Sequence, residues 1–268
     1  MKDYRSFFGF EKEAFPSDIA LKDILVTKAL QGVIQRFEYA LRLGGIALVT
    51  GEIGSGKSTS LRYVSGRLHP SEYKVFNVIA CSGTIMELYR QIVTALTINR
   101  SSISKSNMLN LIKKEITDLA VSQKLKPLLI IDEASMLRLD VLAELHTLCQ
   151  FEQDSQMRLT LILVGHSNLE DKLQYRESAP LASRVIAKTH LEGLNREGMR
   201  EYIHHHVQLA GLTNNPFEDA SITAIHQASG GLLRKANHLS RGALMAAAQN
   251  NSQVVTAEHV RISATELL

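Results

Sequence analysis

The sequence predicts an α/β fold in which a doubly wound parallel sheet is followed by a small all-helical lid domain. Short, continuous runs of apolar and β-branched residues have the composition of strands that are buried on both faces of a parallel sheet. These runs lie at residues 46–50, 75–80, 128–131 and 159–164. Amphipathic helical patterns at residues 85–96 and 108–120 lie between them, and such alternation is typical of a doubly wound sheet.

The C-terminal part of the chain carries helical patterns in place of strand patterns. These patterns lie at residues 196–210, 218–229, 233–249 and 256–260. Asn195 is positioned to cap the first of them, and Gly230 with Gly231 ends the second. The sequence therefore predicts two domains, an α/β domain over residues 1–190 and a helical domain over residues 191–268.

Composition narrows the class of protein. The 268 residues are 45% hydrophobic and 21% charged, an ordinary mixture that can bury a core. The sequence contains no apolar run of the about 18 residues that a membrane span needs, and its first residues are too polar for a signal peptide. Cys81 and Cys149 lie far apart, as expected of reduced thiols in a cytoplasmic protein. The net charge of +3 is compatible with a DNA partner but does not require one.

One segment has the pattern of a phosphate-binding loop. It reads Gly51-Glu52-Ile53-Gly54-Ser55-Gly56-Lys57-Ser58-Thr59. It joins the first predicted strand to a helix, so its backbone N–H groups and the helix N-terminus can face a phosphate. Lys57 is expected to reach the β- and γ-phosphates, and the Ser58 hydroxyl is expected to hold Mg²⁺. The alternative, a chance glycine-rich turn, does not explain the strand–loop–helix context.

A pair of acids supplies the second half of an ATP site. Asp132 and Glu133 directly follow the apolar run at residues 128–131. Asp132 would hold Mg²⁺, directly or through water, and Glu133 would orient and activate the water that attacks the γ-phosphate. Alone, the pair could be a solvated acidic turn at a strand end. With the loop upstream it predicts an ATP hydrolase whose cofactors are ATP and Mg²⁺.

Further polar residues are candidates for sensing or neutralising the γ-phosphate. His166, with Ser167 second, follows the strand run at residues 159–164 and would lie beside the acidic pair; the alternative is a turn residue that caps the next helix. Arg184, with Arg176 in reserve, is the candidate for a cation supplied to a neighbouring subunit. Arg234 would act within its own subunit from the helical domain. Each arginine could instead form a surface ion pair.

Three consecutive histidines, His204, His205 and His206, do not predict a metal site. They fall within a predicted helix, where consecutive side chains point about 100° apart and cannot converge on one ion. Mg²⁺ bound with the nucleotide is the only ion that the sequence implies.

Several segments resemble motifs of the ExeA-like (GspA-like) branch of the AAA+ ATPases. They lie at residues 4–16, 51–58, 130–134, 163–166 and 230–239, and the resemblance extends over nearly the whole chain. It implies a sensor-1 position for His166, a sensor-2 role for Arg234, and packing of Phe15 and Pro16 beside the adenine. Two positions depart from the family pattern, since His166 replaces a glutamine and Leu233 replaces a proline.

The resemblance also implies a function. Members that serve secretion carry a transmembrane segment and a peptidoglycan-binding extension, and this sequence has neither, so it is similar to short, stand-alone regulators of the MuB and TnsC type. We therefore expect an AAA+ ATPase that assembles with ATP on double-stranded DNA, as a ring or helical filament, and recruits a DDE transposase. Arg100 and Lys105 are candidates for DNA contact, and Lys113 and Lys114 are further options. The alternatives are a secretion-assembly ATPase and a non-hydrolysing switch.

Overall fold

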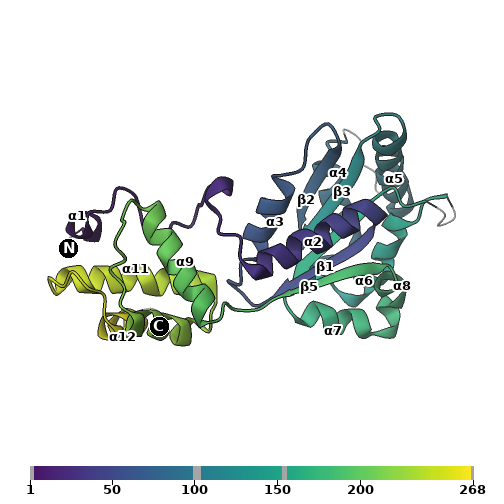
Figure 1. Cartoon of the computed structure of the whole chain (residues 1–268). Helices are drawn as coiled ribbons and strands as arrows, with labels where there is room; N and C mark the ends of the chain where they lie inside the picture. The colour runs from purple at the N-terminus through teal and green to yellow at the C-terminus, as the bar shows by residue number, and fades with distance from the viewer. Residues whose placement is uncertain (1–2, 99–103, 153–155, 267–268) are drawn as a thin grey trace. The chain divides into compact units, whose positions relative to one another are not determined.

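The computed structural model of the chain describes residues 3–98, 104–152 and 156–266. The described chain folds into two compact units, each with a core of its own. The sheet unit consists of Lys28–Gly51 and Lys57–Leu191. The helical unit consists of Met1–Thr27, Glu52–Gly56 and Glu192–Leu268. Figure 1 shows the helices and strands of both units, most of them labelled.

Within the described residues the sheet has five parallel strands in the order β2-β3-β4-β1-β5. They are β1 (Gly45–Gly51), β2 (Tyr73–Ile79), β3 (Lys126–Asp132), β4 (Thr160–Gly165) and β5 (Val185–Leu191). The central strands are buried along almost their whole length, as continuous apolar runs require. The predicted doubly wound parallel fold is confirmed, with the four predicted strands in it.

The apolar runs of the sequence do not include β5, because this strand lies at an edge of the sheet. Its residues alternate, with Ala187 and Leu191 buried and Lys188 and His190 exposed. A half-exposed strand has no continuous apolar run, so its only sequence signal is a period of two. β2 lies at the other edge and alternates in a similar way, which explains why its apolar run is the weaker one.

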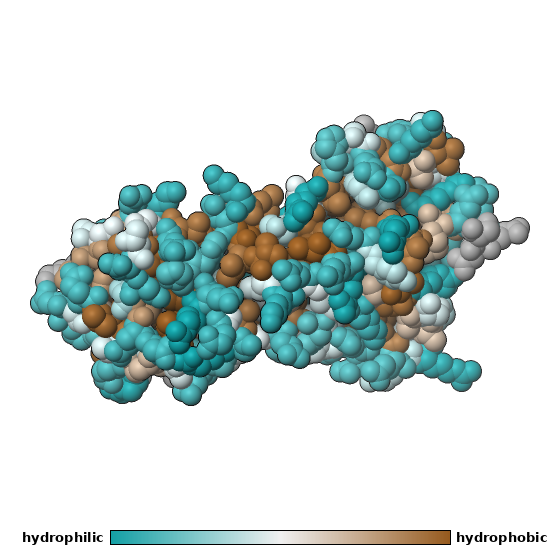
Figure 2. Space-filling view, viewed as in Figure 1, coloured by the Kyte–Doolittle hydropathy of each residue, from teal (hydrophilic) through white to brown (hydrophobic). Residues whose placement is uncertain are grey.

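Helices cover both faces of the sheet (Figure 1). On one face, α2 (Lys28–Leu43) packs on β1 and β5, and α3 (Lys57–Ser65) packs on β1. The main core lies on the other face, against Ile46 and Leu48 of β1. The helices of this layer are α4 (Ile85–Ala95), α5 (Lys105–Val121), α6 (Leu139–Leu145), α7 (Asn168–Gln174) and α8 (Ala179–Ala182). Figure 2 shows hydrophobic residues gathered on the visible surface over the region of α2 and α3.

The helical unit is formed by α1 (Tyr4–Phe8), α9 (Arg196–Leu209), α10 (Asp219–Ser229), α11 (Leu233–Gln249) and α12 (Ala257–Glu266). The side chain of Asn195 caps α9 by accepting a hydrogen bond from the Gly198 N–H at 2.8 Å. Gly230 ends α10 in the left-handed conformation, with φ 61°. In the part of the chain that the structure describes, no helix combines the length and the hydrophobicity needed to cross a bilayer.

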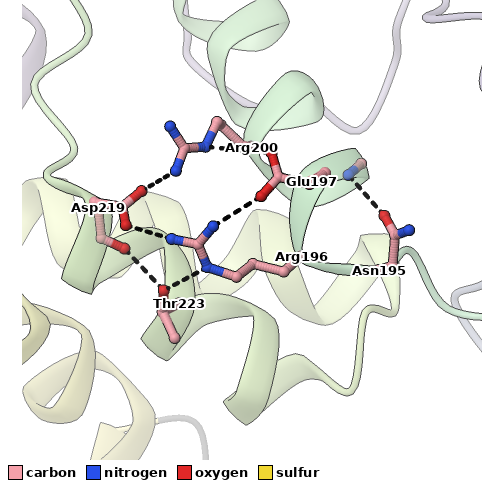
Figure 3. Close-up of polar contacts among 7 residues, drawn as sticks. Asn195, Arg196, Glu197, Arg200, Asp219 and Thr223 are labelled. Atoms are coloured by element: carbon pink, nitrogen blue, oxygen red, sulfur yellow. Dashed lines mark hydrogen bonds and ion pairs between the residues drawn. The ribbon is translucent and has the colours of Figure 1, made fainter.

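Charged residues connect the first turns of α9 and α10 (Figure 3). The guanidinium groups of Arg196 and Arg200 both pair with the carboxylate of Asp219. Arg196 also donates to Glu197 at 2.8 Å and to Thr223 at 3.0 Å. These pairs are partly exposed, so each contributes only on the order of 0.5 kcal/mol. Together they fix the crossing of the two helices and compensate the charge of both arginines.

The opening segment lies in a different unit from the one that the sequence predicts. Residues 1–190 were expected to form one domain, whereas Met1–Thr27 clusters with the helical unit. Its aromatic side chains are the reason, because Tyr4, Phe10 and Phe15 are buried in the core of that unit. The backbone reinforces this placement, since the N–H groups of residues 11 and 12 both donate to the Ala210 carbonyl, at 2.9 and 3.2 Å.

A buried histidine lies beneath this segment. His206 is 3% exposed, and its ring lies 5.2 Å from the Phe15 ring and 4.4 Å from the Tyr202 ring, measured between centroids. Burial, helped by the charge of the adjacent His205, lowers the pKa of His206 to about 4. The folded helical unit therefore keeps this imidazole neutral where an exposed histidine would already be protonated.

The free energy of unfolding should consequently fall as the pH drops from 6.5 toward about 4. In this window the unfolded chain binds a proton at His206 and the folded chain does not, so protons favour unfolding. The full effect is on the order of 3 kcal/mol. It is measured by urea titration of the wild type and His206→Phe at about pH 7 and about pH 4.5. The exposed His204→Asn is the control, and an equal loss of stability in His206→Phe would contradict the assignment.

Candidate nucleotide site

Three neighbouring strands end side by side at the carboxyl end of the sheet. β4 lies between β3 and β1, so the carboxyl ends of these parallel strands bring Gly51, Asp132 and Gly165 to the same end. The register fixes this alignment, because Gly165 pairs with Thr50 of β1. Ligands of open α/β sheets bind beyond the carboxyl ends of the strands. The glycine loop and the acidic pair therefore lie where a phosphate ligand is expected.

Lys57 begins α3, and its side chain turns back toward the end of β1. Its Nζ donates to the Gly51 carbonyl at 2.8 Å, and the residue is 8% exposed. A buried ammonium group needs a partner, and a phosphate oxygen is a stronger, charged acceptor than a carbonyl. In the same loop the buried hydroxyl of Ser55 has no hydrogen-bond partner among the described residues. Both groups fit the phosphates of a nucleotide.

Ser58 and Asp132 lie together although they are far apart in the sequence. The Ser58 hydroxyl donates to one carboxylate oxygen of Asp132 at 3.3 Å. The other oxygen accepts the Glu133 N–H at 2.8 Å, which fixes the orientation of the carboxylate. A hydroxyl and a carboxylate at this separation are oxygen donors of the kind that Mg²⁺ takes in nucleotide sites. The residues present therefore fit the predicted metal.

Glu133 lies at a sharp turn after β3. Its φ of 54° is in the left-handed region, which costs a non-glycine residue on the order of 1 kcal/mol. The turn continues into the short 3₁₀ helix η2 (Ala134–Met136), where the Met136 N–H donates to the Glu133 carbonyl at 2.8 Å. Gly165 of β4 makes this possible, since a Cβ there would lie 2.8 Å from the Ser135 nitrogen.

His166 follows β4, half-buried, at the position between the ends of β3 and β1. Its carbonyl accepts the Leu169 N–H at 3.0 Å and the Ser167 carbonyl accepts the Glu170 N–H at 2.9 Å, so both residues open α7. The backbone of His166 thus has the turn role that the sequence left open. The sensor role of His166 stays a prediction.

Arg234 lies in the first turn of α11, and its backbone N–H donates to the Gly54 carbonyl of the glycine loop at 3.2 Å. Gly54 has φ 83°, and a Cβ there would lie 2.9 Å from the Arg234 Cβ, so this approach requires glycine. The first turn of α11 also holds Lys235 and no acid. Cations at a helix N-terminus oppose the helix dipole, and a bound anion would relieve this conflict.

Arg184 lies at the opposite end of the sheet, where the strands begin. It immediately precedes β5, its carbonyl accepts the Ile46 N–H at 3.1 Å, and its guanidinium donates to the Pro180 carbonyl at 2.7 Å. The strand rise of about 3.3 Å per residue puts this end about 20 Å from the end of β1. The Arg184 side chain therefore cannot reach the end of β1 in the same chain. Arg176 is exposed in the short 3₁₀ helix η5 (Arg176–Ser178).

Phe15 and Pro16 have different surroundings from those that the resemblance implies. Phe15 is 0% exposed, and its ring packs against His206 and Phe217 in the helical core. This side chain is enclosed by protein, whereas Pro16 is half-buried. Adenine contact by these two residues stays a prediction, and Pro16 is the more accessible of the two.

The candidate DNA contacts fall on α5 and the segment before it. Arg100 lies outside the described residues. Lys105 pairs with Glu144 at 2.9 Å, so its charge is already compensated. Lys113 lies 5.8 Å from the centre of the Phe151 ring, and partial burial lowers its pKa. Lys114 is exposed. These surroundings make Lys105 a weaker candidate than the sequence indicates.

Comparison with known proteins agrees with this geometry. Residues 41–173 match the AAA domain family. The protein is an ATP hydrolase that carries an AAA domain over these residues. The chain is 27% identical over 267 residues to General secretion pathway protein A of Aeromonas hydrophila. This alignment covers 98% of the chain but 48% of that protein, so the chain spans about half the length of this curated relative.

Solved structures with the same fold include a protein in complex with DNA and a Holliday junction branch migration motor. Cdc6p from Pyrobaculum aerophilum has a TM-score of 0.71 and 20% identity, with 98% of this chain and 71% of that chain covered. The ORC1 protein of Aeropyrum pernix in complex with DNA has a TM-score of 0.65 and 17% identity, with 92% and 67% covered. The RuvB Holliday junction branch migration motor of Thermotoga maritima has a TM-score of 0.58 and 20% identity, with 89% and 68% covered. The fold is thus that of P-loop AAA+ ATPases.

Contacts made by α7 were not predicted from the sequence. Glu170 of this helix accepts a hydrogen bond from the Thr50 hydroxyl at the end of β1. Lys172 donates to two backbone carbonyls in the turn after β3. A lysine and a glutamate on a short helix carry no sequence signal of such contacts. The threonine that ends the predicted buried strand at residues 46–50 was the available hint, because a buried hydroxyl needs a partner.

Replacing Lys57 tests the loop. Lys57→Ala should weaken ATP binding about 100-fold, because charged hydrogen bonds to phosphate contribute about 1.5–3 kcal/mol each. Titration with a fluorescent ATP analogue measures the affinity. Lys74→Ala, at an exposed position on β2, is the matched control. An affinity within about threefold of the wild type would contradict the assignment.

Proposed function

We propose that this ATPase hydrolyses ATP in a site shared between two copies of the chain, so that bound ATP controls self-assembly. The position of Arg184 is the observation that supports this. It lies at the end of the sheet opposite the glycine loop of its own subunit, as a cation that serves a neighbouring site would. Arginines supplied in this way stabilise the charge that develops on the transferred phosphoryl group.

Apolar side chains near Arg184 support the proposal. Leu43 is 52% exposed, Met157 is 43% exposed and Ile186 is 38% exposed. Met157 and Ile186 lie close to the start of β1, because a Cβ added at Gly44 would be 2.6 Å from Met157 and one added at Gly45 would be 3.0 Å from Ile186. Exposed apolar residues beside a cation that has no substrate in its own subunit are typical of an interface.

Within the shared site we assign a role to each group from its position. Lys57 binds the β- and γ-phosphates, and Ser58 and Asp132 hold Mg²⁺, which would supply neutralising charge at the phosphate oxygens. Glu133 orients a water and accepts its proton while the water oxygen attacks the γ-phosphorus and the bond to the ADP oxygen breaks. His166 and Arg234 respond to the γ-phosphate.

We further propose that the assembly forms on double-stranded DNA. Solved neighbours of this fold include a protein in complex with DNA and a Holliday junction motor, and the net charge of +3 does not oppose a polyanion. Contacts would go mainly to phosphates, so binding would be salt-sensitive and weakly sequence-specific. Recruitment of a DDE transposase rests on the sequence resemblance alone.

A second candidate function is assembly of a secretion apparatus. The observation that favours it is the alignment with General secretion pathway protein A, which extends over 98% of this chain. Both functions use the same ATP site and the same self-assembly. They differ in the surface on which the assembly forms, so DNA binding separates them.

Mixing two inactive variants tests the shared site. Arg184→Ala and Glu133→Gln should each lose most ATPase activity, about 100-fold or more, and both keep the groups that bind ATP. Mixed, they form junctions that combine the intact Glu133 of an Arg184→Ala subunit with the intact arginine of a Glu133→Gln subunit, and these junctions should regain activity. Steady-state ATPase assays over a series of mixing ratios measure this. The sum of the two separate rates at every ratio would refute trans action by Arg184.

DNA binding tests the choice of partner. With a slowly hydrolysed ATP analogue, the wild type should bind a duplex of random sequence, and its affinity should fall steeply with salt. Glu133→Gln should do the same with ATP itself, because the bound nucleotide is not turned over. Electron microscopy and filter binding measure the assembly and the affinity, with Lys57→Ala as the negative control. ATP-loaded protein that assembles but ignores DNA at low salt would favour the secretion function.

A further inference from the structure

The helix α7 contacts both halves of the nucleotide site from outside it. It begins two residues after His166, at the carboxyl end of β4. Leu169 anchors it in the core with 0% exposure. Because β4 lies between β3 and β1, a helix that starts there has the acidic pair on one side and the glycine loop on the other.

Toward β3, α7 contributes a lysine. The Lys172 Nζ donates to the Ser135 carbonyl at 2.6 Å and to the Leu137 carbonyl at 2.9 Å, and the side chain is partly buried. These carbonyls flank Met136, so the ammonium group spans the short helix η2 that follows Glu133. Hydrogen bonds from a charged donor are about twice as strong as neutral ones, which makes this an effective restraint on a backbone turn.

Toward β1, α7 contributes a glutamate. A carboxylate oxygen of Glu170 accepts the hydroxyl of Thr50 at 2.5 Å, and Thr50 is the residue before the first glycine of the loop. The same hydroxyl lies 2.9 Å from Nδ1 of His190 on β5. Residues two apart on a helix point about 200° apart, so Glu170 and Lys172 reach opposite ways. α7 is thereby held on β1 while its lysine holds the turn after β3.

Glu133 is the residue with most need of such a restraint. Its left-handed φ of 54° is unfavourable for a non-glycine residue and persists only where the surrounding structure fixes it. A side chain that must aim at one water loses rate steeply when it moves, by about 100-fold for a displacement of about 1 Å. The two carbonyls bonded by Lys172 are two and four residues beyond it.

We propose that Lys172 is a positioning residue for Glu133, with Glu170 bracing α7 against β1. Lys172 holds η2 through its carbonyls, and η2 holds the Glu133 carboxylate at the attacking water. The inference rests on the proposed role of Glu133. It requires that loss of Lys172 slow the chemical step and leave nucleotide binding intact, because Lys57 and Ser58 lie on a different element.

The test compares Lys172→Met, which keeps the length but loses the donors, with Lys172→Arg, which keeps the charge and donors. Lys172→Met should lower kcat about 10- to 100-fold, with KM and the affinity for a fluorescent ATP analogue within about twofold of the wild type. Lys172→Arg should recover at least about a third of the wild-type rate. Lys74→Met, at an exposed position on β2, is the matched control. Thermal unfolding of each variant monitors the fold, and Lys172→Gln serves in place of Lys172→Met if the latter loses its cooperative transition.

A double variant makes the test specific to Glu133. If Lys172 acts through Glu133, then Lys172→Met added to Glu133→Gln should slow turnover by less than about twofold further. Effects that multiply would overturn the proposal, and so would an unchanged kcat in Lys172→Met or equal losses in kcat and in affinity. Glu133→Gln alone separates the two hypotheses. Normal turnover in it removes the proposed role of Glu133, whereas slow turnover with a normal Lys172→Met removes only the role of Lys172.

Discussion

Parallel pairing of β4 between β3 and β1 is the constraint on which the nucleotide site depends. It aligns three strand ends at one end of the sheet, so that the glycine loop, the acidic pair and His166 share a single face although long stretches of chain separate them. The contact between Ser58 and Asp132 at 3.3 Å is a direct result. The same pairing places α7 where it can touch both neighbours of β4.

Backbone geometry then sets the positions of the reactive groups. The left-handed φ of Glu133 and the close approach of Gly165 to Ser135 turn the chain sharply after β3. Such a turn is stable only when its polar backbone groups are bonded, and Lys172 bonds two of its carbonyls. The unfavourable backbone conformation of Glu133 is thus accompanied by hydrogen bonds from Lys172 that stabilise the turn.

Two arginines of the chain have different surroundings. Arg234 lies against the glycine loop at the N-terminus of α11, whereas Arg184 lies at the far end of the sheet. In the proposed shared site, Arg234 would respond to nucleotide within its own chain, and Arg184 would serve the nucleotide bound by a second copy. The arginines at the start of α9 are paired with acids and belong to the fold of the helical unit.

The sequence by itself determined that the protein hydrolyses ATP. A phosphate-binding loop and a strand that ends in two acids are local patterns, so they can be recognised without the fold. The sequence also determined the buried strands and most of the helices, since their periodicity is continuous. Tertiary structure decided the rest. The edge strand β5 is identified only by its pairing with β1. The opening segment belongs to the helical unit because its aromatic side chains are buried in the core of that unit. Lys172 and Glu170 find their partners because β4 lies between β3 and β1. These features depend on contacts between distant segments, and no local pattern encodes them.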